Sequence, residues 1–372
     1  MSQTDVAELR DEFDRWLTST LPTDYYDKYS TYRWDLGLRR EYQRASFEAG
    51  WIQPTWSPGQ GGRSLPPAAA LEIRLRAALR SAPKLPNIAG PNVAAPAIRS
   101  FGTPDQVSRL LTPCLDGSEW WALGMSEPEA GSDFASLRTR ALRTGDVFTV
   151  NGHKIWTTQA HESRWAVLYV RTDPEAPKHK GISCLVLDME TPGVTIEPVR
   201  MASVSDETFC EVFLDDVEIP ASALLGPENG GWQVAMSALG HERQMIWVMN
   251  WVETRRGLEA LRTNRKGTCD DLHSTVGALL ADAEALRLNG YRALHNESSG
   301  RPSPEGDILK LFGSLALQRT WETVAAALGP AAVTDPDLEF ERHDGLAATI
   351  YGGTSEIQRN IIGERLLGLP KG

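Results

Sequence analysis

Cysteine is scarce in this 372-residue sequence, which has four, at positions 114, 184, 210 and 269. No two of them form a Cys-x-x-Cys pair. Their scattered positions predict reduced thiols and a cytoplasmic location rather than a disulfide framework. The seven histidines form no ligand cluster, so we expect no metal site. Long apolar runs are also missing, and residues 1–15 lack the apolar core of a signal peptide. We therefore expect no membrane partner.

Basic residues are outnumbered, with 38 Lys and Arg against 49 Asp and Glu and a net charge of −11. An acidic chain without a long basic run is a poor nucleic-acid binder, so we expect no nucleic-acid partner. An anionic ligand would be repelled on average and must meet a local basic patch. The hydrophobic content of 41% is ordinary for a globular protein.

Three regions differ in pattern and predict an α+β fold with three domains. Residues 1–118 are helical with Pro-rich joints, residues 119–225 contain short β runs, and residues 226–372 are helical again. In the middle region, Asn151-Gly152 separates the runs 147–150 and 153–158, which is the strongest short hairpin signal. Further short strands without intervening helices predict an antiparallel sheet or small barrel.

The C-terminal region has helical periodicity. Trp232, Ala235, Met236 and Leu239 follow the i, i+3, i+4, i+7 pattern of one helix face. Further helices are expected over 274–295 and 307–328, and a last one near Ser355, which has capping-box spacing to Gln358.

Three segments carry the functional signal. Residues 123–133 read LGMSEPEAGSD, residues 154–158 read KIWTT, and residues 348–359 read ATIYGGTSEIQR. Alone, the first is typical of a loop and the second of a buried strand. The third places a Gly-Gly pair before a helix start, where free backbone N–H groups favour an anion.

Together these segments resemble the acyl-CoA dehydrogenase family over nearly the whole chain. The stretches VNGHKIWTT, VFLDDVEIP, GPENGGWQVAMSALGHER and IYGGTSEIQRNIIGERLLGLP add to the match, in the right order. The resemblance implies an N-terminal helical domain, a middle antiparallel β domain, a C-terminal four-helix bundle and non-covalent FAD. It also implies a homodimer or homotetramer, with a heteromer as an alternative. The expected partners are an acyl thioester of CoA or acyl-carrier protein, and an electron-transfer flavoprotein or similar acceptor.

The family's cofactor and substrate residues carry over by position. The expected flavin contacts are Leu123, Met125, Ser126, Trp156 and Thr158, and the expected adenosine diphosphate contacts are Thr354 and Glu356. The expected substrate contacts are Ser132, Arg243 and Tyr351, with Ser132 and Arg243 near the CoA arm. Arg243 would supply the local positive charge that an anionic substrate requires.

One departure concerns the FAD pyrophosphate. His273 and Ser274 stand where an Arg-Gln pair often sits in relatives, and the usual Gln-x-x-Gly-Gly stretch is absent. Either FAD binds less tightly, or Arg255, Arg256 or Arg265 takes over the contact.

The family places its catalytic Glu in one of two positions. One follows the Tyr of the C-terminal motif, and here Gly352 occupies it and has no side chain to act as a base. The other lies on the helix after the β domain, where this sequence has Glu242. Because Glu242 lies three residues after Leu239, it projects from the apolar stripe, where a raised pKa would suit a proton acceptor.

The implied reaction removes an α-proton by Glu242 and transfers a β-hydride to the flavin, giving a trans-2-enoyl thioester. The Gly352 backbone N–H and the FAD ribityl chain would stabilise the developing enolate. An oxidase or oxygenating enzyme, and a non-catalytic subunit of a heteromeric dehydrogenase, remain alternatives. The acyl group cannot be read: Met245, Trp247, Met249 and Trp251 could line its cavity or pack the helix.

Overall fold

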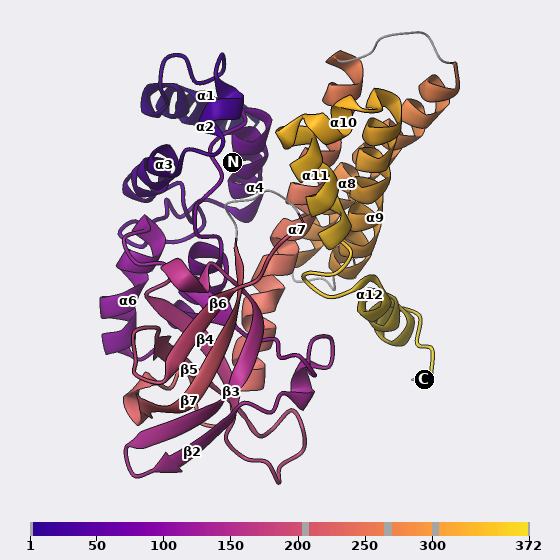
Figure 1. The fold of residues 1–372 in the computed structure, drawn as a ribbon. Helices are drawn as coiled ribbons and strands as arrows, with labels where there is room; N and C mark the ends of the chain where they lie inside the picture. Colours follow the sequence, from indigo (N-terminus) through magenta and orange to yellow (C-terminus); the bar gives the residue numbers. More distant parts are fainter. Residues whose placement is uncertain (1–2, 203–207, 264–269, 300–304, 371–372) are drawn as a thin grey trace.

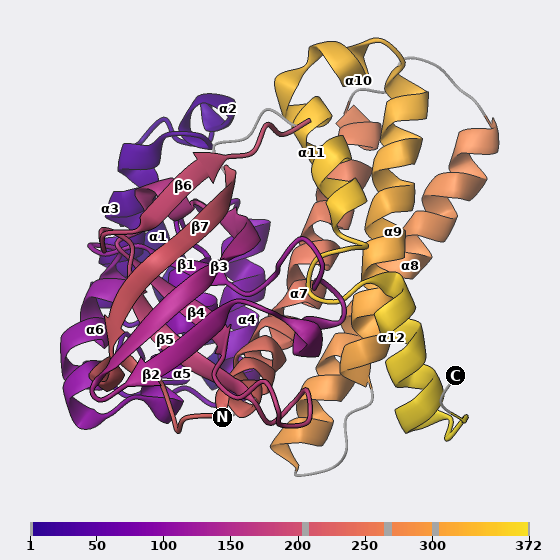
Figure 2. The same cartoon turned by 60° about the horizontal axis from the view of Figure 1, so that its bottom comes forward.

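The computed structural model describes residues 3–202, 208–263, 270–299 and 305–370. Inside the helices it does not describe the side chains of Leu239 and of residues 241–245, so the expected roles of the Glu242 and Arg243 side chains lie outside the described part. Helices come first, a sheet follows, and a second set of helices ends the chain (Figure 1). The long helix α7 (Gly231–Thr263) lies between the sheet and the other C-terminal helices in both views (Figure 2).

The N-terminal helices are α1 (Gln3–Thr20), α2 (Tyr29–Tyr32), α3 (Leu36–Glu48), α4 (Pro67–Leu79), η1 (Gly90–Ala94), α5 (Ala95–Phe101) and α6 (Pro104–Asp116). The strands are β1 (Trp121–Gly124), β2 (Arg140–Thr144), β3 (Val147–Thr158), β4 (Trp165–Arg171), β5 (Ile182–Asp188), β6 (Val194–Pro198) and β7 (Phe209–Pro220). After α7 come α8 (Asp270–Ser298), α9 (Glu305–Leu328), α10 (Ala331–Thr334), α11 (Pro336–Ala347) and α12 (Ser355–Ile361).

The sheet has the strand order β1-β4-β2-β3-β7-β6, and β5 pairs with β4. Most neighbouring strands are antiparallel, as expected, but β1 runs parallel to β4 with Trp121 opposite Trp165. Buried residues such as Phe148, Val170 and Leu185 fill one core against the sheet. The α+β fold class predicted from the sequence is confirmed.

The hairpin expected at Asn151-Gly152 is wrong. Both residues lie inside the continuous strand β3, at a shift in register between β3 and β7. Asn151 exchanges hydrogen bonds with Asp216 on β7, since its Nδ2 donates to Oδ1 and its Oδ1 accepts from the backbone N–H, both at 2.9 Å. A Cβ on Gly152 would lie 2.4 Å from Oγ1 of Thr139. The conformational freedom of Asn-Gly therefore serves a bulge and a close approach.

The C-terminal helices α7, α8, α9 and α11 pack around one apolar core that includes Trp251, Leu286 and Trp321. The last helix begins at Ser355 as expected, but its N-cap is Thr354, whose Oγ1 accepts from the Ile357 N–H at 3.2 Å. The sequence-based capping box started one residue too late, because Ser and Thr are adjacent and both are good caps.

A buried ionic cluster joins the N-terminal helices to α7 and α11. Arg33, which follows α2, pairs with Glu341 on α11. Lys84 lies 3.5 Å from Glu253 on α7, and Arg256 lies 2.9 Å from the same carboxylate. Burial and the nearby Glu253 carboxylate raise the pKa of Glu341 to about 7. Segments some 300 positions apart in the sequence are thus held by charges that are largely removed from water.

No described helix is long and apolar enough to cross a membrane. Within the described residues, no group of His, Cys, Asp and Glu has metal-binding geometry. Cys114, Cys184 and Cys210 are buried and unbridged, and Cys269 lies outside the described residues.

Candidate active site

The loop after β1 and strand β3 form the first half of the candidate site. The backbone N–H of Ile155 donates to the Ser126 carbonyl at 3.0 Å. The Nζ of Lys154 lies 3.3 Å from the Met125 carbonyl. Leu123, on β1, is half-buried and packs against the core beside the N-terminal helices. Two segments about 30 positions apart in the sequence therefore lie side by side.

A buried ion pair between Lys154 and Glu127 links strand β3 to the loop after β1. Lys154 is fully buried, and its Nζ donates to Glu127 at 2.8 Å. Glu127 also accepts from the backbone N–H groups of Arg138 at 2.6 Å and Thr139 at 2.9 Å. Burial lowers the pKa of Lys154 to about 8 despite the carboxylate. The pKa of Glu127 is lowered: burial acts to raise it, and the Lys154 charge and the hydrogen bonds outweigh this.

This pair was missed from the sequence. The available signal is that Lys154 lies an even number of positions after the buried Phe148 and Val150 of the same strand, where a side chain points inward and a buried ammonium requires a partner. Glu127 is a second carboxylate near the expected flavin contacts. Its three donors and lowered pKa make it a poor proton acceptor and assign it to the support of the Met125–Ser126 loop.

Trp156 presents an aromatic face at the surface. Its backbone is in the left-handed region, with φ of 59°, and its side chain is 56% exposed. The ring meets Phe209 of β7 edge-on, with centroids 6.0 Å apart. A left-handed backbone is energetically unfavourable for a bulky residue such as Trp156. Residues held in this conformation cluster at functional sites. Thr158, two residues on, is half-buried at the end of β3.

The loop between α11 and α12 forms the second half. Gly352 has φ of 64°, and a Cβ built on it would lie 2.4 Å from Cδ1 of Ile246 on α7. The buried Lys310 of α9 donates to the Gly353 carbonyl at 2.6 Å and to the Ala348 carbonyl at 3.2 Å. The sequence signal for this contact is a single lysine in the largely apolar stretch 308–317.

This contact joins the Gly352 loop to α7, the helix that carries the other possible position of the catalytic Glu. Ile246 lies four residues after Glu242 in that helix. The backbone of Glu242 and Arg243 is helical, whereas their side chains lie outside the described part of the chain. Tyr351 is half-buried and packs on the core of the C-terminal helices.

The remaining expected contacts lie at the surface. Thr354 caps α12, and Glu356 in its first turn is 3.3 Å from Arg359. The pKa of Glu356 is lowered by its own backbone N–H and by the Thr354 hydroxyl. Ser132 is exposed in the turn before Asp133, which bonds Lys178.

The three arginines considered for the pyrophosphate contact differ in their contacts and exposure. Arg256 is engaged with Glu253 and with the Tyr29 hydroxyl at 3.0 Å. Arg255 is exposed, with its guanidinium 6.0 Å from the Trp251 ring centroid. Arg265 lies outside the described residues.

Comparison with known proteins decides the family. A model of the acyl-CoA dehydrogenase middle domain matches residues 122–217, and a model of the C-terminal domain matches residues 229–367. The acyl-CoA dehydrogenase IpdE1 of Mycobacterium tuberculosis is 32% identical over 99% of this chain and 98% of its own. This chain belongs to the acyl-CoA dehydrogenase family. It is therefore an oxidoreductase that acts on CH–CH bonds of acyl thioesters, with FAD as its cofactor.

Other relatives agree with this assignment. The acyl-CoA dehydrogenase FadE34 of Mycobacterium tuberculosis is 34% identical over 88% of this enzyme and 46% of its own chain. Among solved structures, the Tcur3481-Tcur3483 steroid ACAD superposes with a TM-score of 0.86 at 26% identity, covering 100% of this chain and 99% of the other. The ChsE4-ChsE5 complex of Mycobacterium tuberculosis gives 0.82 at 28% identity, covering 100% and 99%.

The residues present fit a flavin. Its ring is aromatic and carries polar atoms at its edge, so it needs a flat apolar surface and neutral donors. Trp156 supplies an exposed ring, and the backbone and hydroxyls of Ser126 and Thr158 are neutral donors. Thr157 lies between Trp156 and Thr158 on β3, and its Oγ1 is buried without a hydrogen-bond partner.

Proposed function

We propose that this enzyme forms a trans-2-enoyl thioester from a saturated acyl thioester, with Glu242 as the base that removes the α-proton. The observation that carries this proposal is the contact between Gly352 and Ile246. It sets the loop that lacks a carboxylate against the turn of α7 that follows Glu242. A carboxylate beside Ile246 and the apolar residues of α7 would have a raised pKa, which suits proton removal near neutrality.

The Gly352 backbone N–H would donate to the thioester carbonyl oxygen and stabilise charge that develops there. Lys310 supports this role, because its two hydrogen bonds to loop carbonyls fix the course of the chain on both sides of Gly352. When bound, FAD supplies the acceptor for the hydride equivalent of the β-carbon. Tyr351 would border the acyl group, and Ser132 and Arg243 would meet the CoA arm or the phosphopantetheine of an acyl-carrier protein.

The flavin would rest on Leu123, Met125 and Ser126, with Trp156 and Thr158 at its other side. Thr354 and Glu356 would lie near its adenosine diphosphate part. We place the domain boundaries of this enzyme at residues 118 and 225, in the links between α6 and β1 and between β7 and α7.

A second subunit would complete the pyrophosphate site. Support comes from Arg256, which is held by Glu253, and from His273 and Ser274 at the place of the usual Arg-Gln pair. Two similar structures are named as pairs of proteins, Tcur3481-Tcur3483 and ChsE4-ChsE5, and here the second subunit would be a copy of this chain or a related one. The electrons would pass to an electron-transfer flavoprotein or a similar acceptor.

Anaerobic mixing of the FAD-loaded protein with a panel of CoA thioesters tests the proposal. We expect loss of the oxidised flavin absorbance and a product lighter by two hydrogens in mass spectrometry. Bound flavin that no thioester reduces, alone or with a partner chain, would contradict it and favour the non-catalytic subunit. Rapid reoxidation by O₂ but not by electron-transfer flavoprotein would instead identify an oxidase.

A further inference from the structure

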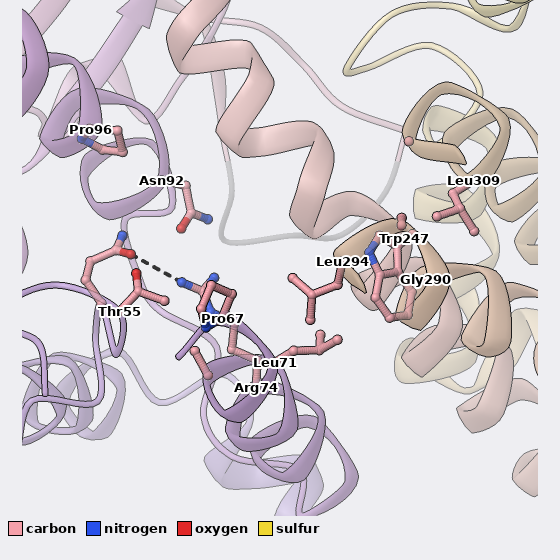
Figure 3. A pocket seen from close by; sticks show the side chains of 14 residues that line it. Thr55, Pro67, Leu71, Arg74, Asn92, Pro96, Trp247, Gly290, Leu294 and Leu309 are labelled. Atoms are coloured by element: carbon pink, nitrogen blue, oxygen red, sulfur yellow. Dashed lines mark hydrogen bonds between the residues drawn. The ribbon is translucent and has the colours of Figure 1, made fainter. Parts of the chain in front are cut away.

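A cavity of about 130 Å³ lies between the N-terminal and C-terminal helices. It is bordered by α4, η1 and α5 on one side and by α7, α8 and α9 on the other. Figure 3 shows that its two walls differ in chemistry. Leu294, Leu309 and Trp247 on the C-terminal helices are apolar, whereas the opposite wall holds the polar side chains Gln53, Thr55, Arg74 and Asn92 beside Pro67, Leu71 and Pro96.

Arg74 is the unusual member of the polar wall. Its Nη2 donates to Oε1 of Gln53 at 3.2 Å, the dashed line in Figure 3. Gln53 is itself fixed, because its Nε2 donates to the Pro91 carbonyl at 2.6 Å. No side chain that the structure describes offers Arg74 a carboxylate. Burial without such a partner lowers the pKa of Arg74 to about 10.

Two other charged residues of α4 pair with side chains of opposite charge. Arg76 donates to the Asp14 carboxylate at 2.8 Å, and Glu72 pairs with Arg10. Arg10 and Asp14 both lie on α1, so these two pairs join α4 to α1, and Glu72 also accepts from the Tyr291 hydroxyl on α8. Arg74 is half-buried, and its guanidinium has one neutral acceptor among the described side chains, so it still has donors that a ligand oxygen in the cavity would meet.

The cavity lies beside the candidate active site. Trp247 lines the cavity, and the preceding residue, Ile246, touches Gly352. On α9 the same relation recurs, since Leu309 lines the cavity and Lys310 bonds the Gly353 carbonyl. Adjacent helix residues point about 100° apart, so the cavity and the Gly352 loop lie on neighbouring faces of the same two helices. Their separation is about one helix diameter, on the order of 10 Å.

We propose that this cavity receives the far end of the acyl group, and that Arg74 selects acyl groups with a hydrogen-bond-accepting oxygen there. The oxygen belongs to a carboxylate or a carbonyl, and both accept from the Arg74 guanidinium and the Asn92 amide. The apolar wall of Leu294, Leu309 and Trp247 packs against the carbon skeleton. This inference rests on the proposed function, because it needs an acyl thioester whose reacting end lies at Gly352.

Three sets of CoA thioesters of equal length test it: plain alkyl, ω-keto and ω-carboxy acyl groups. With the FAD-loaded protein we expect one oxygen-bearing set to exceed the alkyl set in kcat/KM for flavin reduction. Arg74→Met removes the guanidinium and keeps an unbranched side chain. It should reduce that preference by about 10- to 100-fold, the usual range for losing a hydrogen bond to a charged group. A keto preference and a carboxy preference both support the proposal and distinguish the two sources of the oxygen.

Arg76→Met is the matched control, because it removes a guanidinium from the same helix outside the cavity. It should leave the substrate preference unchanged. The melting temperature of each variant, with and without thioester, gives a readout that does not need turnover, since a ligand that binds only the folded state raises it. We expect the oxygen-bearing thioesters to raise it for wild type and for Arg76→Met, and less for Arg74→Met.

Equal kcat/KM values for the three sets, or a preference that survives Arg74→Met in a stably folded protein, would overturn the inference and leave the proposed function intact. If no thioester reduces the flavin, the proposed function fails. The melting-temperature comparison then still decides whether Arg74 recognises the oxygen.

Discussion

Gly352 approaches Ile246 so closely that a Cβ at position 352 would lie 2.4 Å from Cδ1 of Ile246. The contact joins the C-terminal motif to the helix after the β domain, the two places from which this family supplies its base. Gly352 also has φ of 64°, a backbone conformation that a side chain disfavours. A carboxylate at position 352 would therefore need both a strained backbone and a displaced Ile246, which is consistent with a base on α7.

Gly352→Ala should destabilise the protein by about 1–2 kcal/mol, the cost of a left-handed conformation for an L-residue, with more if Ile246 does not move. It should also slow flavin reduction, because the N–H at position 352 shifts with the loop. Gly277→Ala on α8 is the control, since no atom lies within 4 Å of the added Cβ. That change should raise stability slightly through helix propensity. Thermal unfolding of the two variants measures the contrast, and equal effects would contradict it.

The ionic cluster predicts a pH dependence. The pKa of Glu341 is raised from 4.5 to about 7, first by burial and then by the Glu253 carboxylate. Between pH 4.5 and about 7 the folded state thus binds more protons than the unfolded state. The contribution of Glu341 to stability is therefore lost as pH rises through about 7. Glu341→Gln should reduce the fall in melting temperature between pH 5 and pH 8.

Glu259→Gln serves as the control for that measurement. Glu259 is exposed on α7 and pairs with Arg262 three residues on, so its removal should leave the pH profile unchanged. Identical profiles for wild type and Glu341→Gln would show that Glu341 does not titrate in this window.

Trp156 is predicted to serve the flavin rather than the fold. Because its ring is 56% exposed, Trp156→Ala should change the melting temperature of the FAD-free protein little. The dissociation constant of FAD should rise by about 10-fold, since aromatic stacking is worth about 0.5–1.5 kcal/mol beyond buried area. Leu142→Ala removes another exposed apolar side chain from the sheet and should leave FAD binding unchanged. A large loss of stability with unchanged FAD affinity would assign Trp156 to packing.

Much of the fold followed from the sequence because it depends on local patterns. The helices around residues 232–239, 274–295 and 307–328 have the period that was expected, and they were found. The Asn151-Gly152 hairpin was wrong because the same two residues suit a bulge, and only the partner strand decides between the two. The Thr354 cap was missed because Ser355 is an equally good cap by residue type.

The site was less accessible from the sequence, since it is made of contacts between distant segments. The pairing of Lys154 with Glu127 links positions 27 apart, and that of Arg33 with Glu341 links positions 308 apart. Neither has a periodic signal. Arg74 lies in an ordinary helix, and only the packing of α4 against α7 and α8 places it in a cavity.

Substitution of Glu242 by Gln tests the central claim most directly. Gln keeps the volume and cannot accept the α-proton, so we expect a folded, FAD-binding protein whose substrate-dependent flavin reduction is slower by on the order of 10²–10⁴. Stopped-flow absorbance under anaerobic conditions, with the best thioester of the panel, measures this rate. A Glu242→Gln variant that reduces its flavin at the wild-type rate would contradict the account.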